Sequence, residues 1–436
     1  MTLKPNRTIF FLSTALIPWI IVGLRFGSTA IYMSVVLAIL DFKYWTKFCG
    51  RILTFLPTFW FGLLSLGALT FVLRSHDPWI ALGKISLAIC YVQYLKDGLQ
   101  NYGTAGLRCG LGLAVGLAVA QFFEANFYHT SFLATRPLAE KYASSIPLFV
   151  LYDQGLSYAP GLFNSLIRVS GSAPEPGYFS AILTAFAPLF CTKHRVWLLV
   201  ILIGLLVSLS KVTLVQIALT PVCYLAAIFL PLPLALPLLF GAFATITWQL
   251  VPGVTEISYL YTFGRTYFDR IFPVFVYKDL GFWDQIFGVG YSHGCHPLKD
   301  YSFIEAPDTL GRFATFFYEG DCLTFGFSSI GSFLIENGAI GVIFITLFLT
   351  VFRLNFSRNK QKVSEARRQR LIADFCFLQF FVASMSVHYL TLFPAFFVVV
   401  AYGLSLCKVK NTQQAKQEYW RTAGFSPTVG HHVYCK

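Results

Sequence analysis

The chain has 436 residues, of which 56% are hydrophobic and 12% are charged, and its mean hydropathy is +0.64. A soluble domain cannot bury this much apolar surface. The composition therefore excludes an ordinary water-soluble enzyme and predicts an all-α polytopic membrane protein, with residues 1–436 forming one integral membrane domain. The net charge of +13 would suit a nucleic-acid partner, but the basic residues lie in short segments between apolar runs, which favours membrane topology as their cause.

The chain begins with basic residues and a long apolar run, "MTLKPNRTIFFLSTALIPWIIVG", and has no small-x-small cleavage pattern. This start predicts a retained first span rather than a cleaved signal peptide. Apolar runs separated by charged or turn residues predict about twelve transmembrane helices in all. They are expected near residues 8–25, 28–41, 52–73, 79–95, 104–122, 178–192, 196–210, 212–230, 233–252, 329–352, 371–389 and 390–407. The last apolar stretch contains Pro394, which either separates two spans or kinks one.

Lysine and arginine are unevenly distributed among the predicted loops. With the N-terminus in the cytoplasm, most of them fall on the cytoplasmic side, including the dense run "RLNFSRNKQKVSEARRQR" at 353–370 and the tail at 408–436. Cytoplasmic loops of membrane proteins carry this excess. We therefore expect both termini in the cytoplasm, and we interpret the basic run as an anchor beside anionic lipid rather than as a nucleic-acid site.

Two long segments, about 123–177 and about 253–328, then face outward. Long loops that carry aromatic and charged residues usually hold functional residues. Basic residues on this face run against the topological bias, and a charge at or inside a span is costly. Each of them is therefore a candidate for function.

The clearest candidates lie in "RVSGSAPEPGYFS", at the end of the first outer segment. Arg168 and Glu175 are separated by turn residues, and a predicted span follows directly. A glutamate at a helix start is also a routine partner of the helix dipole. The functional interpretation is a carboxylate that binds or deprotonates an acceptor hydroxyl, beside an arginine that binds phosphate through two hydrogen bonds.

Three further cations are candidates for an anion contact. Lys211 in "LVSLSKVTLVQIA" is the lone charge between two apolar runs, and the alternative is a lysine that extends to the membrane interface from a helix end. Arg265 and Arg270 lie in "YTFGRTYFDRIFPVF". Arg270 has Asp269 beside it as a possible local partner, whereas Arg265 follows a glycine and has no evident partner in the sequence.

Histidines and cysteines of the outer face give less specific signals. His293 near Cys295 does not have the spacing of a metal site, so we expect no metal. His388, near the outer end of a predicted span, and His293 are candidates for proton transfer, and the alternative for His388 is a core or interfacial histidine. Cys295 and Cys322 are the two cysteines of the outer side and would form a disulfide in an oxidising compartment.

The chain lacks the glycine-rich and catalytic motifs of nucleotide-dependent enzymes and hydrolases, and it has no DxD pair for a nucleotide sugar. Several cations and one glutamate at the same outer face instead suit an anionic, phosphorylated, lipid-linked substrate.

Four patterns in the chain resemble the O-antigen and exopolysaccharide polymerases of the Wzy type and their relatives, the O-antigen ligases. The patterns are R-x-x-G-x-x-x-E-P at 168–176, S-x-S-[RK] at 208–211, G-R at 264–265 followed by F-G-V-G-Y at 287–291, and L-x-E-x-G-x-x-G at 334–341. Many relatives carry His-Asn about ten residues before the last pattern, where this chain has Phe327-Ser328. That departure disfavours the ligases in particular.

The resemblance implies a metal-independent glycosyltransferase of GT-C-like architecture in the bacterial inner membrane, with its active site facing the periplasm and without a cofactor. Donor and acceptor would be undecaprenyl-diphosphate-linked glycans, joined with release of undecaprenyl diphosphate. Arg168, Lys211 and Arg265 would bind the diphosphate, with Arg270 and Arg312 as second choices, and Glu175 would act on the acceptor. A chain-length-determining co-polymerase and a flippase would be its partners.

Two other functions remain open from the sequence. An O-antigen ligase would transfer the same donor to a lipid A core. A transporter or flippase for lipid-linked sugars belongs to a different class of protein, and it usually shows two repeated halves with paired broken spans. No such internal symmetry is found in this chain.

Overall fold

The structure is a computed structural model, and it is mostly helical. It describes residues 3–20, 22–26, 29–49, 78–133, 149–151, 157–158, 165–173, 176–191, 194–232, 234–236, 238–239, 277, 280–290, 334–341, 343, 363–386 and 394–406. The helices are α1 (Arg7–Ala15), α2 (Met33–Ile39), α3 (Phe42–Cys49), α6 (Pro78–Tyr102), α7 (Ala105–Phe123), α9 (Pro176–Ala185), α10 (Ala187–Phe190), α11 (Val196–Ser208), α12 (Lys211–Phe229), α16 (Phe282–Phe287), α20 (Val363–Ser386) and α21 (Pro394–Ser405). A π-helix, η1 (Glu124–Tyr128), extends α7.

Short strands accompany the helices. They are β1 (Val22–Phe26), β2 (Thr29–Tyr32), β3 (Phe149–Leu151), β4 (Ser157–Tyr158) and β5 (Ile167–Arg168). The first three form an antiparallel sheet in the order β2-β1-β3, in which Leu24 is paired with both Ile31 and Phe149. The last two form a separate antiparallel pair in which Ser157 lies opposite Arg168.

Most predicted helical segments that the structure describes are helical. The segments 79–95 and 104–122 lie in α6 and α7, 178–192 contains α9 and α10, and 196–210 and 212–230 lie over α11 and α12. In the last apolar stretch, α20 ends at Ser386 and α21 begins at Pro394. Proline suits the first helical position because its missing N–H would have no partner there. Of the other predicted spans, 52–73 lies outside the described residues, and 233–252 and 329–352 are described only in part.

The first two predicted spans, 8–25 and 28–41, are wrong as continuous helices. α1 ends at Ala15, and the chain then turns and enters β1. Pro18, just beyond the helix end, lacks the N–H that another helical turn would need. The segment that follows is rich in β-branched and aromatic residues and pairs with the distant strand β3, a partner that local hydropathy does not reveal.

Glycine lets α1 and α7 approach closely. A Cβ atom at Gly106 would lie within contact of Thr14 and Phe11, and one at Gly110 would overlap the carbonyl oxygen of Ala15. α1 and α7 therefore run side by side with little side-chain volume between them. Small residues of this kind allow two helix backbones to pack tightly.

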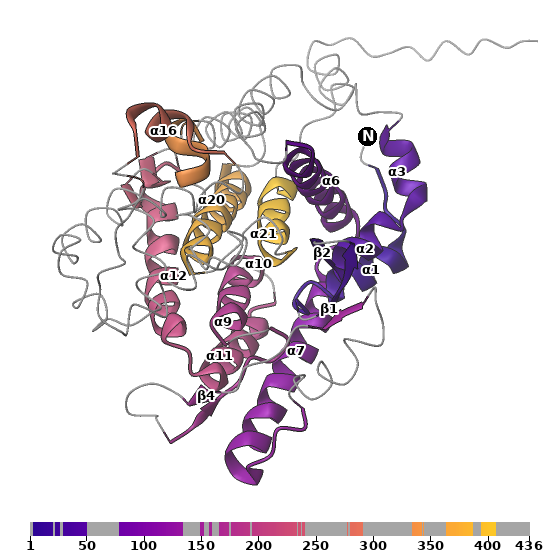
Figure 1. Cartoon of the computed structure of the whole chain (residues 1–436), viewed down its shortest axis with the longest axis vertical. Coiled ribbons are helices and arrows are strands. Elements are labelled where there is room, and N and C mark those ends of the chain that lie inside the picture. Colours follow the sequence, from indigo (N-terminus) through magenta and orange to yellow (C-terminus); the bar gives the residue numbers. More distant parts are fainter. Residues whose placement is uncertain are drawn as a thin grey trace, which may run out of the picture.

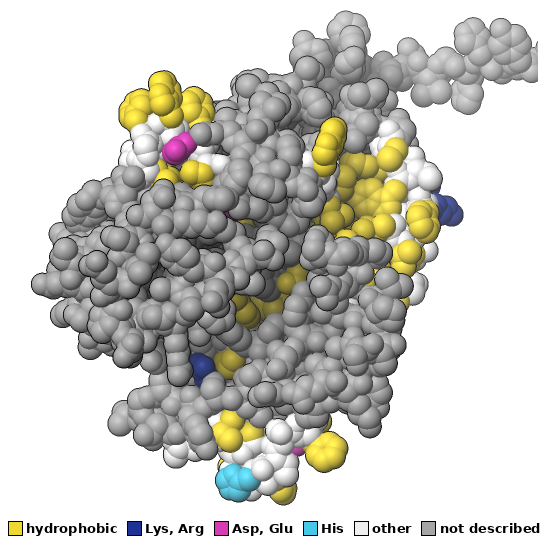
Figure 2. All heavy atoms as spheres, viewed as in Figure 1, with side chains coloured by type: hydrophobic (Ala, Val, Ile, Leu, Met, Phe, Trp, Pro, Cys, Tyr) yellow, Lys and Arg dark blue, Asp and Glu magenta, His cyan; other side chains and the backbone are white. Residues whose placement is uncertain are grey.

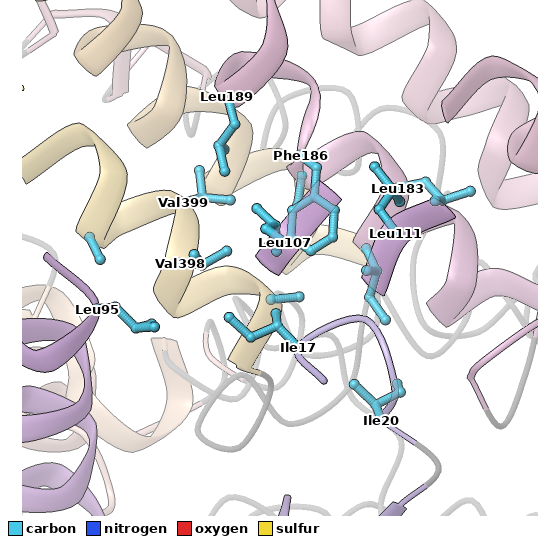
Figure 3. Packing of buried hydrophobic residues seen from close by; sticks show 14 of the residues in the cluster. Ile17, Ile20, Leu95, Leu107, Leu111, Leu183, Phe186, Leu189, Val398 and Val399 are labelled. Atoms are coloured by element: carbon cyan, nitrogen blue, oxygen red, sulfur yellow. The ribbon is translucent and has the colours of Figure 1, made fainter. Parts of the chain in front are cut away.

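The main core forms where the N-terminal and C-terminal helices meet. Figure 3 shows Ile17 near Val398 and Leu107, and Phe186 and Ile20 belong to the same cluster, although these residues come from distant parts of the chain. These side chains are at most 1% exposed. Burial of a large apolar side chain stabilises a fold by about 1.5–3 kcal/mol, so this cluster holds α7, α9 and α21 together. Figure 1 shows that the helices gather around this region.

One helix among the described residues is both long and apolar enough to cross a membrane. It runs over 24 residues, Ala105–Tyr128, and comprises α7 and η1. Shorter apolar helices are Pro176–Phe190, Val196–Ser208 and Gln216–Phe229.

Candidate functional site

Residues 167–173, here called the Arg168 segment, form a braced turn between β5 and α9. Val169, Ser170 and Ala173 are fully buried, and the Ala173 N–H donates to the Ser170 carbonyl over 2.9 Å. Ser172 Oγ donates to the carbonyl of Pro18 over 2.6 Å. Arg168 itself is only half-buried. The segment thus presents a cation at the edge of a tightly packed backbone.

Two side-chain amides bind the ends of this segment. Asn126 in η1 accepts from the Ile167 N–H over 2.6 Å and donates to the Ile167 carbonyl over 2.9 Å. Gln121 in α7 accepts from the Gly171 N–H over 2.9 Å and donates to the carbonyls of Gly171 and Leu133 over 3.4 and 3.0 Å. The backbone on both sides of Arg168 is therefore fixed to the end of α7.

Gly171 lies in the left-handed region, with φ +54°. A Cβ atom there would lie 2.8 Å from two atoms of the Phe179 ring and 3.1 Å from the Ala118 Cβ. Both the backbone conformation and the space require glycine at this position of the R-x-x-G pattern.

Gly171→Ala should destabilise the fold by roughly 2–3 kcal/mol, because it adds backbone strain to overpacking against Phe179. Thermal unfolding of the purified protein measures the effect. Gly103→Ala is the matched control, since Gly103 has a similar φ of +68° but nothing lies within 4 Å of its added Cβ. It should cost only the strain, about 1 kcal/mol. Equal losses for the two variants would contradict this account of Gly171.

A buried hydroxyl cluster joins the start of α9 to the junction of α11 and α12. Ser180 Oγ lies 2.9 Å from Ser208 Oγ and 2.6 Å from Thr213 Oγ1. One turn deeper, Thr184 Oγ1 donates to Gln216 Oε1 over 2.8 Å. Because α12 begins at Lys211, these contacts place the start of α12 beside the first turns of α9.

The first two sequence patterns consequently meet at one end of the bundle. The Arg168 segment leads into α9 at Pro176, and Ser208 with Lys211 forms the junction beside it. Glu175 directly precedes Pro176 but lies outside the described residues, and the Lys211 side chain is also not described. In Figure 1, β4 and the end of α7 mark this end of the molecule.

Aromatic side chains cover the tip of the same end. Phe127, Tyr128 and Phe132 are 65%, 75% and 89% exposed, and Phe123 stacks on Phe127 at 5.4 Å. The tip is folded back by Glu124, whose carboxylate accepts from Thr130 Oγ1 and from the backbone N–H groups of Phe132 and Leu133. In Figure 2 hydrophobic side chains gather at the bottom of the molecule, the same end that carries β4.

The other two patterns also meet, but elsewhere. Val289 and Gly290 donate their backbone N–H groups to the carbonyls of Ile335 and Glu336 over 2.9 and 3.0 Å. Gly288 and Gly338 both have positive φ and lie back to back, so that a Cβ on either would overlap the other segment.

This second junction lies at the opposite end of the bundle from β4. Leu334 packs with Ala227 and Leu232, at and just beyond the far end of α12. Figure 1 shows α16 at the top and β4 at the bottom. The structure therefore brings the four patterns together in two pairs rather than at one site.

Many predicted site residues lie outside the described part of the chain. They are Arg265, Arg270, Arg312, His293, His388, Cys295 and Cys322. Within the described residues, no group of three or more His, Cys, Asp or Glu side chains could hold a metal ion.

Gln121, Asn126 and Ser170 were not predicted from the sequence as site residues. Ser170 Oγ is fully buried and has no hydrogen-bond partner among the residues that the structure describes. Gln121 could have been noticed in the sequence, because it is an amide inside an apolar run and a buried amide needs hydrogen-bond partners. A π-helix has no comparable signature in the sequence.

A second polar cluster lies near the N-terminus. The carboxylate of Asp41, 2% exposed, accepts from the Asn6 N–H over 2.7 Å, and Tyr44 Oη donates to Asp97 Oδ2 over 2.9 Å. Burial raises the pKa of Tyr44, and the nearby Asp97 adds to this. These bonds attach the N-terminal segment to α3 and α6, so the cluster serves the fold.

No protein-family model matches this chain, and no curated protein matches it either.

Proposed function

We propose that this protein is a polysaccharide polymerase of the bacterial inner membrane. It joins undecaprenyl-diphosphate-linked repeat units at the outer face and releases undecaprenyl diphosphate. The proposal includes the predicted membrane spans other than the first two, and the described apolar helices are among them. The aromatic tip formed by Phe123, Phe127, Tyr128 and Phe132 is consistent with a position at the membrane interface, where aromatic side chains are enriched.

The observation that carries the proposal is the placement of Arg168. It lies on a braced backbone, and Pro174 and Glu175 follow six and seven residues later in the sequence, directly before α9 begins at Pro176. The α11–α12 junction with Lys211 lies at the same end. A diphosphate leaving group needs fixed cations because its negative charge grows as the glycosidic bond breaks. Arginine suits this task, since its planar group donates two parallel hydrogen bonds to a phosphate.

The chemistry is a direct displacement. A hydroxyl of the acceptor sugar attacks the anomeric carbon of the donor, and the bond from that carbon to the diphosphate breaks. Glu175 accepts the hydroxyl proton, and the diphosphate leaves as an anion held by Arg168 and Lys211. The donor bond is already activated, so this scheme needs neither a nucleotide nor a metal.

The test is the glycan profile of a strain that lacks this gene. Single repeat units on their lipid carriers, with long chains restored by the wild-type gene, would establish a polymerase. Long chains that accumulate on undecaprenyl diphosphate would instead indicate a ligase. Repeat units confined to the inner leaflet would indicate a flippase and would overturn the proposal.

A further inference from the structure

Asn126 and Gln121 bind the backbone of the Arg168 segment in the same way. Each amide binds both the N–H and the carbonyl of one backbone residue, as a neighbouring β-strand would. The two bound residues, Ile167 and Gly171, lie on either side of Arg168. Among the described residues, the strand pairing of this region is limited to the two-residue ladder of β4 and β5, and so short a ladder is marginal by itself.

The π-helix changes how the two amides are directed. Residues five apart on an α-helix point about 140° away from each other, since each residue turns by about 100°. In a π-turn the N–H bonds back to the carbonyl five residues earlier, so each residue turns by less than in an α-helix, and the direction of Asn126 comes closer to that of Gln121. The wider turn of η1 begins at Glu124, between Gln121 and Asn126.

Both ends of this wider turn are fixed. The His129 N–H donates to the Glu124 carbonyl, and the Glu124 side chain holds residues 130–133. Asn126 Nδ2 also donates to the carbonyl of Phe122 over 3.0 Å. The amide of Asn126 is therefore oriented by its own helix before it binds Ile167.

We infer that Gln121 and Asn126 are positioning residues that hold Arg168 for the diphosphate of the lipid-linked donor through the π-turn η1. This inference rests on the proposed function. The two amides contact the backbone on either side of Arg168 and act through it, rather than on the substrate. A misplacement of about 1 Å at a reacting group can reduce a rate by about 100-fold, so such bracing has a large effect on catalysis.

The central variant is Asn126→Leu, which has a similar shape but loses both bonds to Ile167. Asn126→Asp keeps the acceptor for the Ile167 N–H and loses the donor. The matched control is Asn101→Leu, because Asn101 in α6 also bonds to backbone carbonyls, those of Leu3 and Asp97, but far from the Arg168 segment.

Two measurements are made on the purified full-length variants. The first is hydrogen exchange at the amides of Ile167 and Gly171. The second is polymerisation of the lipid-linked repeat unit extracted from the deletion strain. For Asn126→Leu we expect about tenfold faster exchange at Ile167 and a kcat about 10–100-fold lower, with KM changed less than threefold. Asn126→Asp should be intermediate, and Asn101→Leu should keep the wild-type kcat.

A double variant separates positioning from a general structural role. In an Arg168→Ala background, Asn126→Leu should cause no further loss of kcat, because its effect passes through Arg168. An unchanged kcat in Asn126→Leu, or a full additional loss in the double variant, would overturn the inference. If Asn126→Leu does not accumulate, Asn126→Asp and Gln121→Glu carry the same test.

Failure of the proposed function would give a different result. Wild-type protein that forms no polymer would overturn the polymerase assignment, whatever the variants do. Hydrogen exchange at Ile167 and Gly171 would then still test whether the amides hold the backbone around Arg168. Unchanged exchange in Asn126→Leu would contradict this role, and faster exchange would support it.

Discussion

Replacement of Arg168 by alanine should leave cells with single repeat units on their carriers and almost no long chains. Loss of one group that stabilises a developing anion typically lowers kcat by about 10²–10³-fold. Arg168→Lys keeps the charge but loses the planar pair of donors, so it should restore only a small part of the activity. Electrophoresis of the surface glycan from a complemented deletion strain measures both.

The control for this experiment is Arg367→Ala. Arg367 is an exposed arginine of α20, and its removal changes the net charge by the same amount. It should restore full-length chains. All variants need equal protein levels in the membrane fraction, because Arg168 also lies in a packed segment. Wild-type chain length from the Arg168→Ala protein would exclude Arg168 from the site.

Gly110→Val should prevent normal assembly of the N-terminal part of the bundle. The added side chain would overlap the Ala15 carbonyl, so α1 would have to move away from α7. Ordinary overpacking costs about 1–3 kcal/mol, and a clash with a backbone atom that cannot rotate away should reach at least the upper end of this range. We expect a strong fall in the thermal unfolding temperature or in the amount of folded protein.

Gly116→Val isolates the effect of packing from that of helix propensity. Gly116 lies in the same helix, but no atom lies within 4 Å of its added Cβ. Valine has the same intrinsic helix propensity at both positions, so any difference between the variants reports the α1–α7 contact. Equal stability of the two variants would show that α1 does not pack against Gly110.

Long apolar helices were predictable because each one is specified by its own sequence. The apolar run at 104–122 predicted α7, and the apolar run at 390–407 predicted α21. β1 was not predictable in this way. Its partner β3 lies more than a hundred residues away, and an apolar run of this length suits a helix or a strand equally well.

Part of the candidate site could also be predicted from the local sequence. Arg168 and Gly171 could be noticed in the sequence. A cation at the edge of a predicted span is costly, and a glycine in a turn often marks a backbone conformation that other residues avoid. The bracing residues do not stand out, since Gln121 and Asn126 are ordinary polar residues until the fold brings Ile167 and Gly171 against them. The pairing of Gly288 with Gly338 was also hidden, because it depends on a contact between distant segments.

The contact between Gly288 and Gly338 also fixes the two ends of the chain segment that lies between them. The bonds from Val289 to Ile335 and from Gly290 to Glu336 bring together the two ends of the segment 291–333. The entropy of closing a loop depends only on the logarithm of its length, so ten added residues would change the free energy by a few tenths of a kcal/mol. The two glycines of this contact are sterically fixed, whereas the entropy of bringing the two ends together changes little with the number of residues between them. Evolution can therefore lengthen or shorten this segment with little effect on the stability of the helices that carry it.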